Sequence, residues 1–431
     1  MEKKDCKNYR RKKCSKNKEN TEYDFSQAGE KMMKRSLTVS LQSVLLYVII
    51  IGFLFPRGYI GVSETYHKVC SATMWLSVIL TWLQWIKCSR TRSKLFKGKI
   101  EKYALQITTY FILSIIITMV CRRSVSSGLQ QLLAAPSVCV FMILNMKRNP
   151  KKLLDNIVNV LCVEFTINLV MTLLQPDFYG LYHTIFLGHI QVVSQYGVLA
   201  ILVSVLSWML YHDRTKRIVY LFIITLYTML TTDAEAAVFT AIAFVIAFVI
   251  YKWKLSQVLM LPSEVYIIVM VALSALIVYF SAVNTNFLSY LDINGRSFVW
   301  KSALEKIELR PIFGYGIDGV LLSTFWTKGF NYAHNQLVQN LLDGGVILMI
   351  SFWGMILGFA KDINKIKITR YRVLCNASLI ALLFIMLFES TTLYIYMYMI
   401  LSIIFSVRTL VKDREEIINN GFNYKGKTAS C

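Results

Sequence analysis

Residues 283–335 read VNTNFLSYLDINGRSFVWKSALEKIELRPIFGYGIDGVLLSTFWTKGFNYAHN and form a polar stretch of 53 residues between two apolar runs. Outside the two tails, no other part of the chain is as long and as polar. The rest of the sequence is mostly apolar, in runs that suit a lipid bilayer. The polar stretch is therefore the place where chemistry on the water side of a membrane can be built.

The apolar runs predict an all-α, polytopic membrane protein with about 12 transmembrane helices. Hydrophobic residues make up 55% of the 431 positions, and a membrane-spanning helix needs about 20 mostly apolar residues. The runs that meet this description are 37–55, 69–86, 103–121, 128–146, 153–174, 190–210, 217–232, 235–251, 264–282, 336–360, 373–388 and 391–407.

The charge distribution predicts the orientation. Of the 47 lysines and arginines, 38 fall in the tails and in alternate loops on the N-terminal side, and nine fall in the other loops. Positive charge concentrates on the cytoplasmic side of membrane proteins, so we expect both termini in the cytoplasm and the large loop outside it. The expected organisation is a basic tail 1–36, nine helices in 37–282, the loop 283–335, three helices in 336–407, and a tail 408–431.

The net charge of +22 does not indicate nucleic-acid binding, because its placement follows the membrane. The basic tail 1–36 is expected to lie against anionic lipid headgroups. No cleavable signal peptide is apparent after this long basic lead. The nine cysteines are scattered without a CxxC motif, and none lies in the large loop, so no disulfide framework is expected.

Within the loop, residues 296–309 are predicted to form a short amphipathic helix. Asp292 or Asn294 can cap its start, and the Arg310-Pro311 pair ends it. An apolar stripe at helical spacing favours packing on the membrane surface or across the mouth of the bundle. Three glycines and one proline in 311–319 predict a tight turn or a close approach of the backbone to another group.

His334 closes the loop and is the candidate general base, since a histidine can accept a proton from a hydroxyl at neutral pH. The competing interpretation is a histidine that only caps the next helix. Beyond it, Gln336, Asn340 and Asp343 share one helical face. With Asn335, this polar face predicts a wet substrate cavity rather than a lipid-facing surface.

Other polar residues give weaker signals. Arg122 and Arg123 stand in a predicted outer turn, where they either snorkel to headgroups or bind an anion. Gln195 lies at the polar outer start of a helix and is either part of a substrate cavity or an interhelical hydrogen bond. Asp233 and Glu235 have the D-x-E spacing of some metal sites, but two carboxylates alone are a weak indication. No metal or other cofactor is expected.

These residues resemble the O-antigen ligase and Wzy-type polysaccharide polymerase family. The topology, with one large outer loop late in the chain, resembles that family along its whole length. The matching motifs lie mainly in 186–197 and 295–345 and comprise Phe186-Leu187-Gly188, Gly295-Arg296, Trp300, Pro311, Gly314-x-Gly316, Ala333-His334-Asn335 and Gly344-Gly345.

The resemblance implies a glycosyltransferase in the bacterial cytoplasmic membrane that polymerises surface polysaccharide such as capsule, exopolysaccharide or O-antigen. Its substrate would be an oligosaccharide repeat unit on undecaprenyl diphosphate, joined to a sugar acceptor outside the membrane. His334 would be the base, and Arg296 and Arg310 would bind the diphosphate. Family members often carry Ser-Arg near the start of the helix at 235–251, and its absence here suggests Arg122 or Arg123 as the missing cation.

Three alternatives stay open. A ligase that moves finished glycan to another acceptor uses the same donor and leaving group. A flippase for the same lipid-linked sugar is expected to show two similar halves, and no internal repeat is visible. A structural membrane protein would not require His334 and Arg296. A flippase and a chain-length regulator are also possible partners, and no nucleic-acid partner is expected.

Overall fold

A computed structural model describes residues 42–91, 97–175, 184–211, 215–232, 235–252, 259–283, 295–324, 329 and 332–427. Residues 49–431 make up one compact unit, and residues 1–48 are a separate one. The account below concerns the larger unit.

Each of the twelve predicted apolar runs coincides with a helix. The first helix is described over Gln42–Leu54. The others are α2 (Glu64–Thr91), α3 (Lys97–Val120), α4 (Ser126–Arg148), α5 (Pro150–Leu174), α7 (Val193–Tyr211), α8 (Thr215–Thr231), α9 (Glu235–Lys252), α10 (Ser263–Val283), α12 (Gln336–Ile363), α13 (Thr369–Phe388) and α14 (Ile395–Lys427).

The helices identify a multi-pass membrane protein. Among the described residues, eight helices are long and apolar enough to cross a bilayer, and the segments Gln42–Leu54, Ala237–Ile246 and Ile395–Val411 are shorter apolar helices. The total of about 12 crossings stays a prediction. One predicted boundary is wrong, since α14 begins at Ile395 rather than 391 and leaves residues 389–394 as a connecting loop.

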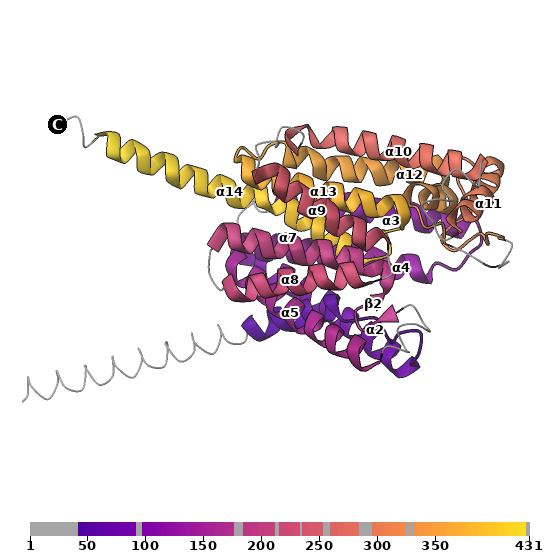
Figure 1. The fold of residues 1–431 in the computed structure, drawn as a ribbon, viewed down its shortest axis with the longest axis horizontal. Helices are drawn as coiled ribbons and strands as arrows, with labels where there is room; N and C mark the ends of the chain where they lie inside the picture. The colour runs from indigo at the N-terminus through magenta and orange to yellow at the C-terminus, as the bar shows by residue number, and fades with distance from the viewer. Residues whose placement is uncertain are drawn as a thin grey trace, which may run out of the picture. The chain divides into compact units, whose positions relative to one another are not determined.

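Helix α7 is at the centre of the bundle. It packs against α5, α8, α9, α13 and α14, and 89% of its most apolar window is buried, against 28% for α2. A helix that is apolar on every side is suited to such a position, because neighbours can cover each face. Figure 1 shows α10 and α12 running alongside each other, with α11 (Arg296–Leu309) at one end of them.

The predicted outer loops contact one another at one end of the unit. The Arg57 backbone N–H donates to the Leu187 carbonyl at 3.1 Å, and the Tyr332 hydroxyl donates to the Ser390 carbonyl at 2.9 Å. The predicted cytoplasmic loops also contact one another, as in the 2.7 Å ion pair between Arg408 and Asp362. Each of these contacts joins two loops that the charge pattern placed on the same side, while the side of the membrane that each group faces stays a prediction.

Helix α11 confirms the predicted helix 296–309 within the loop. Its N-cap, however, is Gly295 with a φ of 71° rather than Asp292 or Asn294, and it ends at Arg310 as expected. Trp300 and Ala303 are fully buried in a cluster with Val278 of α10 and Val338 of α12. The helix therefore packs on the bundle.

A break in α12 anchors the glycine-rich part of the loop. Gly344 and Gly345 leave the helical conformation, the latter with a φ of 61°. A Cβ on Gly345 would lie 2.2 Å from the Ile312 carbonyl carbon, so only glycine fits there. The backbone hydrogen bonds across the break are Tyr315 N to Leu342 O at 2.7 Å, Gly316 N to Asp343 O at 3.0 Å and Val346 N to Pro311 O at 2.9 Å. The close backbone approach predicted for 311–319 is confirmed, because a Cβ on Gly314 would lie 2.4 Å from Leu342 O at this break.

The sequence did not predict a short β-hairpin before α7. Strands β1 (Thr184–Ile185) and β2 (Gly188–His189) pair antiparallel, and a 3₁₀ turn at Ile190–Val192 leads into α7. Gly58 N donates to Phe186 O at 3.1 Å, which ties the first outer loop to this hairpin.

Candidate active site

His334 is held in an unusual backbone conformation at the junction of the loop and α12. Its φ of 49° lies in the left-handed region, which costs a non-glycine residue about 1–3 kcal/mol and persists only when the surroundings enforce it. The neighbouring Ala333 supplies that constraint. Its carbonyl accepts from the Trp300 indole at 2.9 Å, and its N–H donates to the Gln339 side chain at 2.8 Å.

The capping of α12 is carried out by Asn335, so His334 is left for another task. The Asn335 side chain accepts from Val338 N at 3.0 Å, as an N-cap does. Its amide also donates to the Ser274 hydroxyl at 2.9 Å and the Leu387 carbonyl at 2.8 Å. Asn335 is fully buried and therefore positions the helix start rather than lining a cavity.

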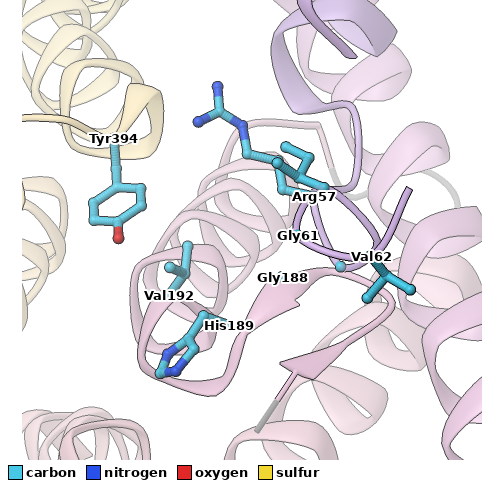
Figure 2. Close-up of a pocket in the computed structure, with 9 residues that line it drawn as sticks. Arg57, Gly61, Val62, Gly188, His189, Val192 and Tyr394 are labelled. Atoms are coloured by element: carbon cyan, nitrogen blue, oxygen red, sulfur yellow. The ribbon is translucent and has the colours of Figure 1, made fainter. Parts of the chain in front are cut away.

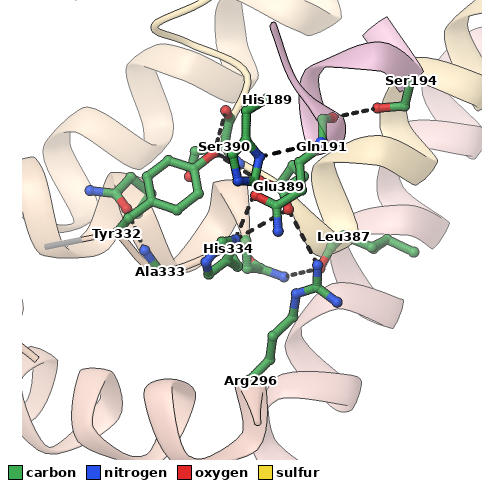
Figure 3. A network of polar contacts seen from close by, with 12 residues as sticks. His189, Gln191, Ser194, Arg296, Tyr332, Ala333, His334, Leu387, Glu389 and Ser390 are labelled. Carbon is green, nitrogen blue, oxygen red and sulfur yellow. Dashed lines mark hydrogen bonds and ion pairs between the residues drawn. The ribbon is translucent and has the colours of Figure 1, made fainter. Parts of the chain in front are cut away.

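The His334 imidazole faces a buried carboxylate. Its Nδ1 lies 3.2 Å from Oε1 and 3.4 Å from Oε2 of Glu389, whose side chain is 3% exposed. Arg296 Nη2 reaches the same Oε1 at 3.3 Å, and the Tyr332 hydroxyl donates to Oε2 at 3.0 Å. Figure 3 shows these side chains converging on Glu389 from the loop and from α11.

This arrangement suits a general base. If Nδ1 carries the proton and donates it to Glu389, Nε2 is the nitrogen that can accept a proton from a hydroxyl. A carboxylate behind the ring fixes the tautomer and stabilises the imidazolium that forms. The His334 side chain is 15% exposed, so the protein does not enclose it fully.

Glu389 is the residue that sequence reasoning missed. It is the C-cap of α13, at the end of the bundle where the predicted outer loops lie. The available signal was its position: a carboxylate in the two-residue gap between the predicted runs 373–388 and 391–407. An ionisable group beside the bilayer is costly unless it is paired. A partner for this carboxylate was therefore to be expected, and it is His334, 55 residues earlier in the chain.

Tyr332, at the end of the large loop, is hydrogen-bonded to the loop 389–394, which is called the Glu389 loop below. Its one hydroxyl proton is shared between Glu389 Oε2 and Ser390 O, which lies at 2.9 Å, and the hydroxyl oxygen accepts from Ser390 N at 2.9 Å. Burial raises the pKa of the Tyr332 phenol well above its usual range, and the Glu389 charge adds to the effect. The phenol therefore stays protonated and remains a hydrogen-bond donor at neutral pH.

The polar face of α12 is hydrogen-bonded within the helix and to neighbouring segments, and this geometry gives no support to the predicted wet cavity. Gln336 and Asn340 are fully buried and bonded to each other at 2.9 Å. Gln336 also accepts from Thr391 N at 2.6 Å, and Asn340 accepts from the Tyr110 hydroxyl at 3.1 Å. Asp343 accepts from Gln339 at 2.9 Å. These bonds hold the Glu389 loop and α3 against the helix.

Only Arg296 of the four predicted diphosphate-binding arginines joins the described cluster. Arg310 is exposed and stacks on the Tyr315 ring, with its guanidinium carbon 4.9 Å from the ring centroid. Arg122 and Arg123 are exposed in the turn between α3 and α4. Their roles in diphosphate binding have no support in this geometry.

The remaining candidates are Gln195 and the possible metal ligands. Gln195 is buried in α7, and neither its amide nitrogen nor its amide oxygen has a hydrogen-bond partner among the described residues. Asp233 and the side chain of Glu235 lie outside the described residues. Within the part of the chain that is described, no three His, Cys, Asp or Glu residues gather as a metal site would require.

A pocket lies near this cluster, on the side of the first outer loop. It has a volume of about 400 Å³ and is lined by Arg57, Gly58, Ile60, Gly61, Val62, Gly188, His189, Val192 and Tyr394 (Figure 2). Tyr394 connects it to the cluster, because it stands in the loop 389–394 that also carries Glu389.

Comparisons with known proteins indicate the family that this chain resembles. The sequence model of the family described as O-Antigen ligase matches residues 219–353, which include α11 and His334 but end before Glu389. A Rickettsia felis protein named "Putative polysaccharide ligase" is 30% identical over 89 residues, 18% of this chain and 22% of the relative. The chain thus matches about a fifth of that relative. These findings confirm the predicted resemblance to the O-antigen ligase and Wzy-type family.

Proposed function

We propose, from the resemblance to the O-antigen ligase family, that this protein is a membrane glycosyltransferase that polymerises surface polysaccharide. Its donor would be an oligosaccharide repeat unit linked to undecaprenyl diphosphate, and its acceptor a sugar hydroxyl on a second glycan. The observation that carries the proposal is the buried cluster of His334, Glu389, Arg296 and Tyr332. A purely structural role explains this cluster poorly, because burying charged groups costs stability.

In the proposed reaction, the acceptor oxygen bonds to the anomeric carbon of the donor sugar while the bond from that carbon to the phosphate oxygen breaks. His334 Nε2 takes the hydroxyl proton, and Glu389 stabilises the resulting imidazolium at Nδ1. The diphosphate leaves on its lipid with the bonding electron pair. Arg296 contacts Glu389 through Nη2, and its guanidinium, which has five N–H donors, would also bind the diphosphate as it leaves.

The orientation belongs to the same proposal. The site would face away from the cytoplasm in the bacterial cytoplasmic membrane, where lipid-linked units are exposed after transfer by a flippase. Lys68 is in an exposed pair on the predicted outer side, and Lys151 is exposed on the predicted inner side. In a cysteine-free variant, Lys68→Cys should react with a membrane-impermeant maleimide in intact cells, and Lys151→Cys only after permeabilisation. The reverse pattern would invalidate the orientation.

The test of the reaction is the surface glycan of cells that carry His334→Ala. We expect the long ladder on a gel to disappear, with single repeat units still reaching the surface and with normal protein levels in the membrane. A ladder of wild-type length and intensity would contradict the role of His334. Repeat units trapped on the cytoplasmic face would indicate transport instead.

A ligase is the second candidate, and the names given to the matching family and to the Rickettsia relative favour it. The site would be the same, because the donor and the leaving group are the same. The two reactions differ in the product that accumulates. A polymer of normal length that stays on its lipid carrier in His334→Ala cells would identify the ligase. A chain-length regulator would be a partner only of the polymerase.

A further inference from the structure

The pocket beside the cluster is built by backbone segments that fit closely. Arg57 N and Gly58 N donate to the carbonyls of Leu187 and Phe186, both at 3.1 Å. A Cβ on Gly58 would lie 2.1 Å from Ile185 O, so the loop can approach the hairpin this closely only with glycine. The two segments, more than 120 residues apart, thus form one wall.

Arg57 gives this pocket a positive charge. Its side chain is half-buried, and its guanidinium donates to the Met74 sulfur at 3.9 Å, a weak acceptor. Among the described residues, no carboxylate lies within ion-pair distance of Arg57. A partly buried guanidinium without a counterion is a favourable place for an anion to bind.

The lining favours an anion over a neutral sugar. None of the nine lining residues is aspartate or glutamate. Figure 2 shows the Arg57, His189 and Tyr394 side chains on different sides of the same space. His189 Nδ1 accepts from Gln191 N at 3.4 Å. All three side chains can donate hydrogen bonds to phosphate oxygens.

The pocket is also electrostatically close to the proposed catalytic groups. Tyr394 lines the pocket and stands in the loop 389–394 that carries Glu389. Burial raises the pKa of the Tyr394 phenol, the Glu389 charge raises it further, and the Arg57 charge lowers it. The charge of Arg296 is already balanced by Glu389 at 3.3 Å. Arg57 would therefore be the uncompensated positive charge nearest to a diphosphate that leaves from this cluster.

We propose that the pocket lined by Arg57, His189 and Tyr394 binds the phosphate groups of the lipid-linked donor. The inference rests on the proposed function, since it assigns a binding site to that donor. Arg57 takes the place that the sequence suggested for Arg122 or Arg123. A guanidinium can bind phosphate oxygens in a two-point manner, which lysine cannot reproduce.

The test uses the purified full-length protein in detergent and farnesyl diphosphate, a soluble short-chain polyprenyl diphosphate. Its affinity is measured by thermophoresis for the wild type, Arg57→Gln, Arg57→Lys and Lys68→Gln. We expect Arg57→Gln to weaken binding at least about tenfold. Lys68→Gln is the matched control, because Lys68 is an exposed cation on the same side, and we expect its affinity to be unchanged.

Binding of farnesol and of inorganic pyrophosphate is measured separately, to distinguish the contribution of the lipid chain from that of the phosphate groups. Arg57-dependent binding of pyrophosphate, together with weak binding of farnesol, supports a phosphate site. Equal affinity for farnesol and farnesyl diphosphate would overturn the proposal, as would an Arg57→Gln affinity within about twofold of the wild type. If Arg57→Gln does not run as a single species on gel filtration, Arg57→Lys decides instead, and unchanged affinity there overturns the proposal.

The two proposals can fail separately. A normal ladder in His334→Ala cells combined with Arg57-dependent binding would remove the proposed reaction and leave the phosphate site. Loss of the ladder in His334→Ala cells combined with normal binding by Arg57→Gln would remove the phosphate site and leave the reaction.

Discussion

Replacing Glu389 with glutamine keeps the shape of the side chain and removes the charge that faces the His334 imidazole. At 3.2 Å from Nδ1, a full charge interacts with an imidazolium by about 5 kcal/mol at an effective dielectric constant of about 20. Arg296 and Tyr332 share the same carboxylate. We therefore expect a net loss of about 3–4 kcal/mol in the transition state, a rate factor of about 10² to 10³.

The assay is elongation in isolated membranes supplied with lipid-linked repeat units, with initial rates at several donor concentrations. Glu389→Gln should lower the maximal rate much more than it changes the apparent donor affinity, because it acts on the proton-accepting group. Glu64→Gln is the control, since that carboxylate is 81% exposed on the predicted outer side. Its rate should match the wild type.

A second variant separates catalysis from stability. Glu389→Gln leaves the buried Arg296 without its counterion, and breaking such a pair destabilises proteins by about 3–5 kcal/mol. The double variant Glu389→Gln with Arg296→Gln should regain part of that stability in a thermal-unfolding measurement, but no activity. Recovery of activity together with stability would refute the catalytic reasoning, as would a single-variant rate within about threefold of the wild type.

Three further outcomes are expected. Arg296→Lys should lose most of the elongation activity, at least about tenfold, because it keeps the charge but not the two-point fork; near-normal rates would contradict the diphosphate role. Gly345→Ala should lower the melting temperature clearly, since its φ is 61° and the added Cβ meets the loop backbone, while Gly354→Ala in open space of the same helix should not. Equal shifts would contradict the account of the helix break. Burial raises the pKa of Tyr394 to about 12, and an unfolded tyrosine ionises near about 10. Below pH 10 its contribution to stability is complete, and it is lost as the pH rises to 12. In Tyr394→Phe, the melting temperature should therefore fall less steeply between pH 10 and pH 12 than in the wild type. The same slope in both proteins would contradict this role of Tyr394.

Much of the fold could be predicted because each membrane helix satisfies its own backbone hydrogen bonds. Length and apolarity then suffice to locate the segments, and each of the twelve predicted runs coincides with a helix. Helix 296–309 was also predictable, since it depends on local periodicity and on the Arg310-Pro311 stop. Its Gly295 cap was not, because a cap depends on how the chain enters from outside the helix.

The candidate site was only partly predictable. His334 and Arg296 stood out as a lone loop histidine and as an arginine in a family motif, and the structure brings both to Glu389. The predicted cavity of Gln336 and Asn340 has no support in the structure, because spacing along a helix shows that residues share a face but not what covers it. Here α3 and the loop after α13 cover that face.

The sequence by itself determined the class of protein, the helical segments and the candidate base, because hydrophobicity, charge bias and local motifs act over short distances. The tertiary structure decided which residues share a site. Glu389 meets His334 from 55 residues away and Arg296 from 93, and Arg57 meets the hairpin at 185–188 across more than a hundred. Such pairings follow from the packing of the helices and from the break at Gly344 and Gly345, to which the loop is hydrogen-bonded. No local sequence pattern encodes them.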